Sequence, residues 1–564
     1  MKSNSDLEDL ISHGRYFEAR SKAEDILKTG ADPRVSQLLA LSISKAGMPE
    51  LALETIEPVY RQSPDDSESA GIMGSIYKEL FRKNQKTTFA LQSRDTYLKN
   101  FTLTKNYYTG INAASMSALA GQMSKAREIA AQVIIEVDKT NKGFWELATL
   151  GEANLLVKNK VASIESYVQA RKLAGNDWGK VTSVHNQLWL LNHYIAVPNE
   201  VMKLFAPPNV VAFSGHMIDH PNRATPRFPA GIERQVKEAI RNSIRTMNAR
   251  IGYTSIACGS DILFIEAMLE EGGEVNLFLP FSQADFVKTS IAFAGKQWVS
   301  RFFDIIDKHP VNYISTGMYS SNDELFTFLS RVIYGSAVLR GQATHSEPHL
   351  LTVLSEMDLK KREGGTRDTI DRWPYRQKHV NINPDIFISQ PLSTTTEPAE
   401  TFSFERNNDK LMYLVYVGVE ESLLKELDKV IAEHEHTIED QSLAIKAVDL
   451  LQSSRVLAME TDMGAMEFVA MVENEFRQYK TQNKLKFALH AGSVSISAKK
   501  LSGSGLEHIK NIGNHISAGS ICASDYFASV LALSNRNYNL SYAGVIQSSE
   551  IGYTRSFFTV EKLA

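Results

Sequence analysis

Hydrophobic and polar positions divide the chain into differently patterned stretches. Up to about residue 205, apolar positions recur at helical spacing and almost no β-patterned run occurs, which predicts successive amphipathic helices. Beyond Pro207 and Pro208, short apolar runs that stop at Gly, Ser or Pro alternate with helical stretches. Because proline cannot continue a helix, this pair marks the end of the helical region. The pattern predicts a helical region followed by domains that contain sheets.

Three helical segments in the first region look related. Each has a run of small residues followed by a bulkier run, at 39–47 with 51–56, 110–121 with 126–130, and 145–153 with 162–170. Small residues let two antiparallel helices approach closely, and the bulkier ones are buried against the next pair. Residues 1–205 are therefore predicted to form an all-α helical-repeat solenoid that binds a protein partner. They resemble tetratricopeptide (TPR) repeats, with a generic helical-hairpin solenoid as the alternative.

The middle region, residues 209–375, alternates strands with helices. Apolar β-rich runs lie at 210–216, 256–261, 275–281, 311–315 and 350–354, and helices are predicted at 229–248, 260–271 and 283–308. Alternation of this kind forces parallel pairing with right-handed crossovers. The region is therefore predicted to be an α/β domain on a parallel sheet, and such sheets bind nucleotides at the carboxyl ends of their strands.

Candidate binding residues follow the first two strands. In Ser214-Gly215-His216, the glycine lets the backbone approach a ligand, and the hydroxyl and imidazole offer hydrogen bonds beside it. In Gly259-Ser260-Asp261, either Ser260 or Asp261 can cap the helix that follows. Free N–H groups at the start of a helix favour phosphate. These loops predict a nucleotide-type site.

Four motifs in this region carry a resemblance to a known superfamily. They are Ser-Gly-His at 214–216, Gly-Ser-Asp-Ile-Leu-Phe-Ile-Glu-Ala at 259–267, Leu-Pro-Phe at 279–281 and Gly-Gly-Thr-Arg-Asp at 364–368. The region resembles the Rossmann-like SLOG superfamily, and more narrowly the module joined to TPR repeats in apoptosis signal-regulating kinases and their bacterial relatives. The resemblance implies binding of a nucleotide-derived ligand by Ser214, Gly215, His216, Gly259, Ser260, Asp261, Gly364, Gly365 and Thr366.

Some SLOG relatives cleave N-glycosidic bonds, and Glu266 is the candidate for a catalytic carboxylate. An anion beside the sugar would stabilise the developing oxocarbenium charge. The alternative is a helix residue in a salt bridge. The segment Gly364-Gly365-Thr366 lacks the further glycine and downstream glutamate of hydrolytic relatives, so cleavage is an open question.

Residues 376–405 are rich in Pro, Ser and Thr and are predicted to be a polar linker. The last region, residues 406–564, has β-patterned runs at 411–417, 455–459, 485–492, 520–523 and 557–560, and helical stretches at 421–435 and 464–480. This order predicts an α+β domain on a mostly antiparallel sheet.

The last region resembles class III nucleotide cyclases at 487–494, 505–514, 518–524, 542–544 and 557–558. An active cyclase needs two carboxylates to hold its metal ions. The family pattern places Tyr416 and Ser453-Ser454 at the positions of those carboxylates, and Lys510 and Asn514 at those of the ribose-orienting Asn and the transition-state Arg. A shift of one residue could restore one site through Asp449 or Asn511, but not the whole set. The resemblance implies a cyclase-like domain without turnover.

Composition excludes several classes of function. A net charge of −4 and an isoelectric point near 6.4 give no basic footprint for nucleic acid or an anionic membrane. The start of the chain is polar, no run has the length of a membrane span, and Cys258 and Cys522 lie in different predicted domains. We therefore expect a cytoplasmic protein with neither a disulfide framework nor a metal site.

Together, the patterns and resemblances predict a signalling or regulatory protein. A SLOG-like site would sense a nucleotide-derived ligand without requiring a cofactor, and residues 406–564 would mediate homo-oligomerisation or bind a nucleotide. The first alternative is an effector enzyme that cleaves a nucleotide or NAD, for instance in antiviral defence. The second is a purine nucleotide cyclase under the control of the helical array, and the third is a scaffold with no small ligand.

Overall fold

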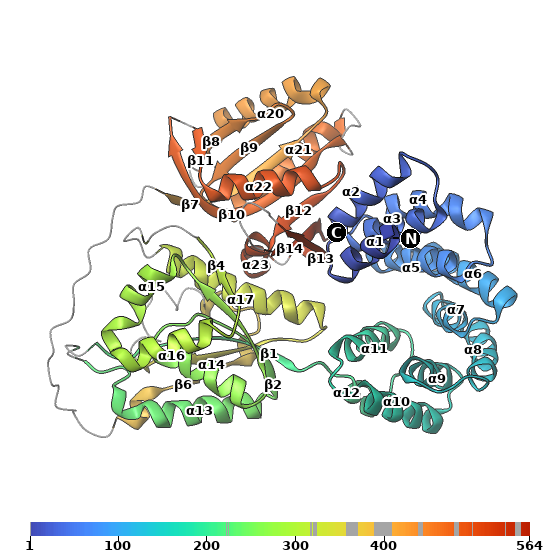
Figure 1. Cartoon of the computed structure of the whole chain (residues 1–564), viewed down its shortest axis with the longest axis horizontal. Coiled ribbons are helices and arrows are strands. Elements are labelled where there is room, and N and C mark those ends of the chain that lie inside the picture. The colour runs from blue at the N-terminus through green and yellow to red at the C-terminus, as the bar shows by residue number, and fades with distance from the viewer. Residues whose placement is uncertain are drawn as a thin grey trace. The chain divides into compact units, whose positions relative to one another are not determined.

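The computed structural model describes residues 2–220, 223, 225–315, 319, 324–356, 370–388, 409–437, 444–478, 484–498, 500–535, 537–547 and 554–563. The chain forms two compact units, Met1–Pro207 with Tyr542–Thr554, and Pro208–Ser541 with Arg555–Ala564. Figure 1 shows the elements of both units with their labels. In the described part of the chain, no helix is both long enough and apolar enough to cross a membrane.

The first unit is an array of helices in which consecutive members pack side by side (Figure 1). Short turns join the helices, so neighbours form antiparallel pairs. The helices are α1 (Lys2–Ser12), α2 (Tyr16–Leu27), α3 (Pro33–Lys45), α4 (Pro49–Gln62), α5 (Ser67–Asn84), α6 (Thr87–Thr104), α7 (Tyr107–Leu119), α8 (Met123–Val137), α9 (Phe144–Leu156), α10 (Lys160–Ala174), α11 (Trp178–Asn192) and α12 (Asn199–Leu204).

Small residues lie where the helices of a pair touch, as the repeat pattern predicts. A Cβ atom at Gly110 of α7 would lie 2.7 Å from Val133 of α8, and one at Gly151 of α9 would lie 2.7 Å from the Tyr167 ring of α10. The Ser163 hydroxyl of α10 donates to the Gly151 carbonyl oxygen over 2.8 Å. These contacts close each pair and confirm a TPR-like helical-repeat solenoid.

A polar network joins four helices of the array. Lys78 of α5 donates to Gln187 of α11, and Gln187 donates to Glu152 of α9, each over 2.7 Å. Ser115 of α7 also donates to Glu152. Burial raises the pKa of Glu152 and lowers that of Lys78. Hydrogen bonds compensate polar groups that are removed from water, so the network holds the array as one scaffold.

The second unit contains a parallel six-stranded sheet in the order β4-β3-β2-β1-β5-β6. The middle residues of β1 are buried Val, Ala and Phe, as expected for a strand that is covered on both faces. The strands are β1 (Asn209–Gly215), β2 (Ala249–Thr254), β3 (Glu274–Leu279), β4 (Val311–Tyr313), β5 (His349–Val353) and β6 (His379–Ile382).

The chain moves outward from β1 to β4 and then crosses to the other side of β1. Right-handed crossovers therefore place α17 on the face of the sheet opposite α13 and α14. The helical elements are η1 (Ala230–Ile232), α13 (Glu233–Thr246), α14 (Ser260–Glu270), α15 (Gln283–Ser290), η2 (Ala292–Ala294), α16 (Lys296–Ile306) and α17 (Glu324–Ala343).

Three sequence expectations for this region need correction. The predicted strand over 256–261 is wrong, because β2 covers Ala249–Thr254 and α14 begins at Ser260. The predicted helix over 283–308 is broken, because Gly295 has a φ of 100° that helices do not contain. The predicted linker begins too early, because His379–Ile382 form strand β6, and the short helices η3 (Arg376–Lys378) and η4 (Pro384–Phe387) flank it. Four residues pairing with β5 are too short a run for the composition of the segment to reveal.

A second, mixed sheet has the order β13-β14-β12-β10-β7-β9-β8, with β11 paired to β10. Strand β10 pairs parallel with β12 and antiparallel with β7. The strands are β7 (Lys410–Gly418), β8 (Ile445–Leu450), β9 (Ser454–Met459), β10 (Lys486–Ser497), β11 (Lys500–Ser502), β12 (Ile521–Ser524), β13 (Tyr538–Gln547) and β14 (Thr554–Lys562). The helical elements are η5 (Glu421–Leu423), α20 (Leu424–Thr437), α21 (Asp462–Gln478), α22 (Ser504–His515) and α23 (Asp525–Ser534).

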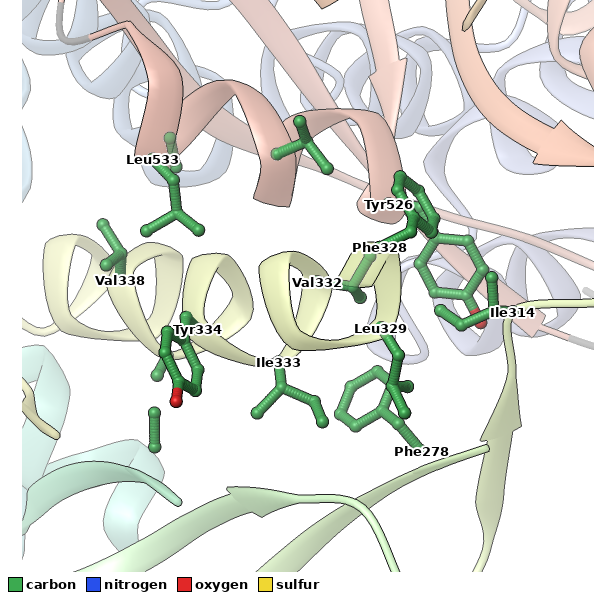
Figure 2. Packing of buried hydrophobic residues seen from close by; sticks show 14 of the residues in the cluster. Phe278, Ile314, Phe328, Leu329, Val332, Ile333, Tyr334, Val338, Tyr526 and Leu533 are labelled. Atoms are coloured by element: carbon green, nitrogen blue, oxygen red, sulfur yellow. The ribbon is translucent and has the colours of Figure 1, made fainter. Parts of the chain in front are cut away.

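The two sheets share one hydrophobic core. Helix α17 lies between strands of the parallel sheet and helix α23 of the mixed sheet (Figure 2). Its Leu329 and Ile333 point to the strands, and its Val338 points toward Leu533 of α23. One continuous cluster of buried side chains runs through both sheets. The middle region and the last region apart from Tyr542–Thr554, expected as separate domains, therefore form a single compact unit.

Candidate functional site

The candidate site lies where β1 and β5 end, at the point where the order of the parallel strands reverses. The N–H of His216 donates to the Val353 carbonyl oxygen over 3.0 Å. The N–H of Ser355 donates to His216 Nε2, also over 3.0 Å. His216 is 7% exposed. Because its ring accepts a hydrogen bond at Nε2, it joins the loop after β1 to the loop after β5. Ligands of doubly wound sheets bind at such a reversal point.

The loop after β1 also covers the start of α14. The Ser260 hydroxyl and N–H both donate to the His216 carbonyl oxygen, over 2.8 and 3.1 Å. Gly259 has a φ of 99°, and a Cβ atom there would lie 2.5 Å from the Ile218 nitrogen. The Ser260 N–H is therefore engaged by the protein itself. The sequence expected this helix start to offer free N–H groups to a phosphate, and that expectation does not hold for Ser260.

Asp261 lies in the first turn of α14 and is 7% exposed. Its carboxylate accepts a hydrogen bond from the Ala257 N–H over 3.3 Å, and among the described residues no cation forms a salt bridge with it. Burial raises the pKa of Asp261 to about 7, and the hydrogen bond from the Ala257 N–H offsets only part of that rise. Neither Asp261 nor Ser260 caps the helix, since the N-cap position is Gly259.

Tyr334 of α17 enters the site from the opposite face of the sheet. Its side chain is fully buried, and its hydroxyl makes no hydrogen bond of good geometry among the described residues. Burial raises the pKa of Tyr334 well above its usual range, hydrogen bonding with the nearby Ser214 side chain lowers it, and the charge of Asp261 raises it. The phenol therefore lies within electrostatic reach of Ser214 and Asp261. Figure 2 shows its hydroxyl pointing from α17 toward the strands.

Other buried polar atoms in the described part of the unit also lack hydrogen-bond partners. They include Thr254 Oγ1 at the end of β2 and Trp373 Nε1, whose indole packs edge to face on the Tyr334 ring at 5.8 Å. A buried donor or acceptor without a partner costs about 1–3 kcal/mol. Sequence analysis missed Tyr334, Thr254 and Trp373. The signal for Tyr334 was a stretch over 324–343 that is apolar on every side, which is typical of a fully buried helix.

Gly215 has a structural reason to be glycine. A Cβ atom at Gly215 would collide with Ser260 Oγ and lie 2.8 Å from Val353 Cβ. The missing side chain therefore allows β1, β5 and α14 to meet, whereas the sequence suggested that it makes room for a ligand. Gly364, Gly365 and Thr366, the other expected binding residues, lie outside the described residues.

Glu266 does not join this cluster. Arg301 of α16 donates to both of its carboxylate oxygens over 2.7 and 2.8 Å, and Lys237 of α13 donates to it over 2.8 Å. Burial alone would raise the pKa of Glu266, but the hydrogen bonds from the two cations outweigh it, and the pKa is lowered. The geometry fits the salt-bridge alternative and gives a catalytic role no support.

Of the four cyclase-pattern positions, two are buried, one is ion-paired and one is exposed. Tyr416 in β7 is buried against α22, where a Cβ atom at Gly513 would lie 2.6 Å from its ring. Ser454 is buried at the start of β9. Lys510 forms an ion pair with Asp449 at 3.3 Å, so the carboxylate that could have restored a metal site faces an ammonium. Asn514 is exposed on α22.

The described residues also offer no cluster of metal-binding side chains. Among the described residues, no three His, Cys, Asp or Glu side chains converge as they would around a metal ion. Neutral hydroxyls such as those of Tyr416 and Ser454 do not replace two carboxylates around Mg²⁺.

Comparison with known proteins identifies the helical array. A family model described as Tetratricopeptide Repeats-Sensor matches residues 15–117. No curated protein matches the chain. A thermophilic TPR protein from Thermus thermophilus is similar at 19% identity, with a TM-score of 0.29, over 33% of this chain and 98% of its own. The match to the family model shows TPR-type repeats over residues 15–117, and such repeats commonly mediate protein interactions.

Two other solved structures are similar over parts of the chain. MamA from Desulfovibrio magneticus RS-1 is 10% identical with a TM-score of 0.24, over 30% of this chain and 92% of its own. An adenylate/guanylate cyclase/hydrolase from Silicibacter pomeroyi is 13% identical with a TM-score of 0.23, over 28% of this chain and 100% of its own.

Proposed function

We propose that the chain is a cytoplasmic regulatory protein that binds a nucleotide-derived ligand at the carboxyl ends of β1 and β5. In this proposal, the TPR-type array binds a protein partner, and the parallel sheet is a SLOG-like, Rossmann-like domain. The mixed sheet is a cyclase-like domain that has lost turnover and serves dimerisation or nucleotide binding. No cofactor is required.

The observation that carries the ligand site is the set of buried polar groups near the carboxyl ends of β1, β2 and β5. Asp261 has no cationic partner among the described residues, and the Tyr334 hydroxyl and Thr254 Oγ1 have no hydrogen-bond partner there. A fold that carries the cost of unpaired buried groups gains stability when a ligand supplies their partners. With a pKa of about 7, Asp261 can donate or accept a hydrogen bond near neutral pH.

The absence of a paired charge among the described residues distinguishes this set from a structural cluster. Asp261 and Tyr334 come from opposite faces of the sheet and meet only at its edge, where hydroxyls, an imidazole and a carboxyl group lie together. Such groups suit the hydroxyls and ring nitrogens of a nucleoside. The two cysteines of the chain are both unpaired and buried, which fits a reducing compartment.

Self-association through residues 406–564 is part of the proposal, but it cannot be tested by deleting them. Helix α23 covers an apolar side of α17, so the deletion would expose buried residues of the parallel-sheet region. Light scattering of the full chain over a range of concentrations is the appropriate measurement. A mass of one chain at every concentration would contradict self-association.

The ligand proposal is tested by native mass spectrometry of the purified full chain, followed by calorimetry with ATP, NAD and ADP-ribose. We expect at least one of these nucleotides to bind, and Asp261→Asn to weaken its binding by about tenfold, which corresponds to about 1.4 kcal/mol. The matched control is Glu270→Gln on the exposed side of the same helix, which should leave affinity unchanged. Absence of binding by all three nucleotides, with none co-purifying, would contradict the proposal.

A further inference from the structure

Helix α17 is buried along much of its length, between strands of the parallel sheet and helix α23 of the mixed sheet. Leu329 and Ile333 face the strands of the parallel sheet, and Val338 faces α23 of the mixed sheet (Figure 2). A helix packed on two sides cannot shift against one neighbour without shifting against the other. The contacts of α17 on its two sides therefore determine whether a displacement at one sheet reaches the other.

The contact between α17 and α23 is a close approach of backbones. A Cβ atom at Gly335 would collide with the backbone carbonyl group of Ser529 in α23. Beside it, the hydroxyls of Ser336 and Ser529 are hydrogen-bonded over 3.0 Å. Glycine is needed at this crossing, so the distance between the two helices is fixed by Gly335.

Polar contacts tie the same side of α17 to the mixed sheet. Arg331 donates to the Tyr413 hydroxyl of β7 over 2.8 Å and to Asp462 of α21 over 3.1 Å. Ser534, the last residue of α23, donates to the other oxygen of Asp462. Arg331 and Asp462 are largely buried, so these bonds position α17, α21 and α23 together.

Tyr334 lies directly before Gly335 in the chain and points to the opposite side. Its hydroxyl lies within electrostatic reach of Ser214 and Asp261 and has no hydrogen-bond partner among the described residues. A displacement of α17 at Gly335 therefore moves Tyr334 relative to Asp261.

We propose that α17 couples the site around Asp261 to helix α23 of the mixed sheet. A ligand that bonds to the Tyr334 hydroxyl stabilises the contact between Gly335 and Ser529. In turn, loosening of that contact weakens ligand binding at the site around Asp261. Coupling between two sites is reciprocal in free energy, so each end must report on the other. The inference rests on the proposed function only for the identity of the ligand, because the mechanical coupling exists without one.

The coupling is tested by hydrogen exchange of the full chain without ligand. Gly335→Ala forces α17 and α23 apart and is expected to speed amide exchange in residues 525–534. We also expect exchange in residues 210–217 and 257–262 to rise by at least about fivefold, the lower end of coupling between sites. Faster exchange confined to 525–534 would overturn the proposal. If Gly335→Ala does not fold, the double variant Ser336→Ala with Ser529→Ala loosens the same contact more gently.

Two controls separate coupling from general destabilisation. Ser330→Ala alters a hydroxyl of α17 that bonds only within its own helix, to Phe326, and should change neither region. Val430→Ala removes buried side-chain volume from α20, away from α17, and reports the effect of lower global stability. An equal change at 210–217 and 257–262 in Val430→Ala, at matched stability, would also overturn the proposal.

Hydrogen exchange with added ligand tests the coupling in the other direction, from the site around Asp261 to α23. ADP-ribose should slow exchange in residues 525–534 of the wild type, and this protection should be reduced at least about fivefold in Gly335→Ala. Protection at 210–217 with none at 525–534 would contradict the coupling. If ADP-ribose does not bind, the proposed ligand is wrong, while the exchange measured without ligand still decides the coupling.

Discussion

Two carboxylates on one short helix have opposite surroundings. Asp261 at the start of α14 is buried without a described cationic partner, and its pKa is raised to about 7. Glu266, five residues later, is held by Arg301 and Lys237, and its pKa is lowered despite burial. The fold itself supplies the cations that Glu266 requires, whereas it supplies none to Asp261 among the described residues. Pairing, more than position near a strand end, separates the structural carboxylate from the candidate binding group.

The largest expected effect concerns the backbone contact that builds the Asp261 end of the helix. Gly259→Ala should lower the free energy of unfolding by about 3–5 kcal/mol, because it combines a strained positive φ with a collision against Ile218 and His216. Urea denaturation measures this change. Gly272→Ala is the matched control, since Gly272 also has a positive φ but has nothing within 4 Å. Equal losses in both variants would contradict the role of the contact.

The next effect is on the pH dependence of folding stability, to which the two carboxylates contribute with opposite sign. The folded chain holds the Asp261 proton up to about pH 7, whereas an unfolded aspartate releases it near pH 3.8, so stability falls as the pH rises between these values. The difference corresponds to at most about 4 kcal/mol. Glu266 contributes stability above about pH 4.5 that is lost as the pH falls through its lower folded pKa.

Comparing wild type with Asp261→Asn at pH 5 and pH 8 isolates the first of these contributions. The wild type should lose more stability between the two pH values than the variant, because the variant has no proton to release. Thermal unfolding at each pH provides the measurement. Parallel losses in both proteins would show that Asp261 is not perturbed.

The smallest expected effect is the removal of a cation from Glu266. Arg301→Ala should cost about 1–2 kcal/mol, between the values for exposed and buried pairs, because both side chains are about a quarter exposed and Lys237 remains. Arg245→Ala, which breaks the pair between the exposed Arg245 side chain of α13 and Glu271 at the end of α14, should cost less, about 0–1 kcal/mol. Denaturation measures both changes. A larger loss of stability in Arg245→Ala than in Arg301→Ala would contradict the predicted difference between the two ion pairs.

The contrast also shows how far the sequence could lead. Helical spacing over residues 1–205 and the alternation beyond Pro208 predicted the repeat array and the parallel sheet, because burial imposes periodicity on long elements. The loop holding His216 was found for the same reason, since it follows a buried strand. Asp261 was expected at the end of a strand over 256–261, but it lies in the first turn of α14. What pairs with each side chain could not be found, because Arg301 lies 35 residues beyond Glu266 and meets it only in the fold.

Tyr334 and strand β6 were missed for related reasons. An aromatic residue in an apolar helix resembles any core residue until its hydroxyl is seen to lack a partner among the described residues. Strand β6 is short and sits in a polar segment, so only its pairing with β5 reveals it. The contact between α17 and α23 depends on Gly335, and the sequence does not indicate which residues lie against a single glycine in a helix.

The most direct test of the account compares thermal unfolding of Asp261→Asn and Glu266→Gln with and without ADP-ribose. Ligand bound to the folded state raises the melting temperature. The account predicts that Glu266→Gln melts lower than wild type but keeps the ligand-induced rise. Asp261→Asn should melt at or above the wild-type temperature and lose that rise. The reverse pattern, with the rise kept in Asp261→Asn and lost in Glu266→Gln, would contradict the assignment of the two carboxylates.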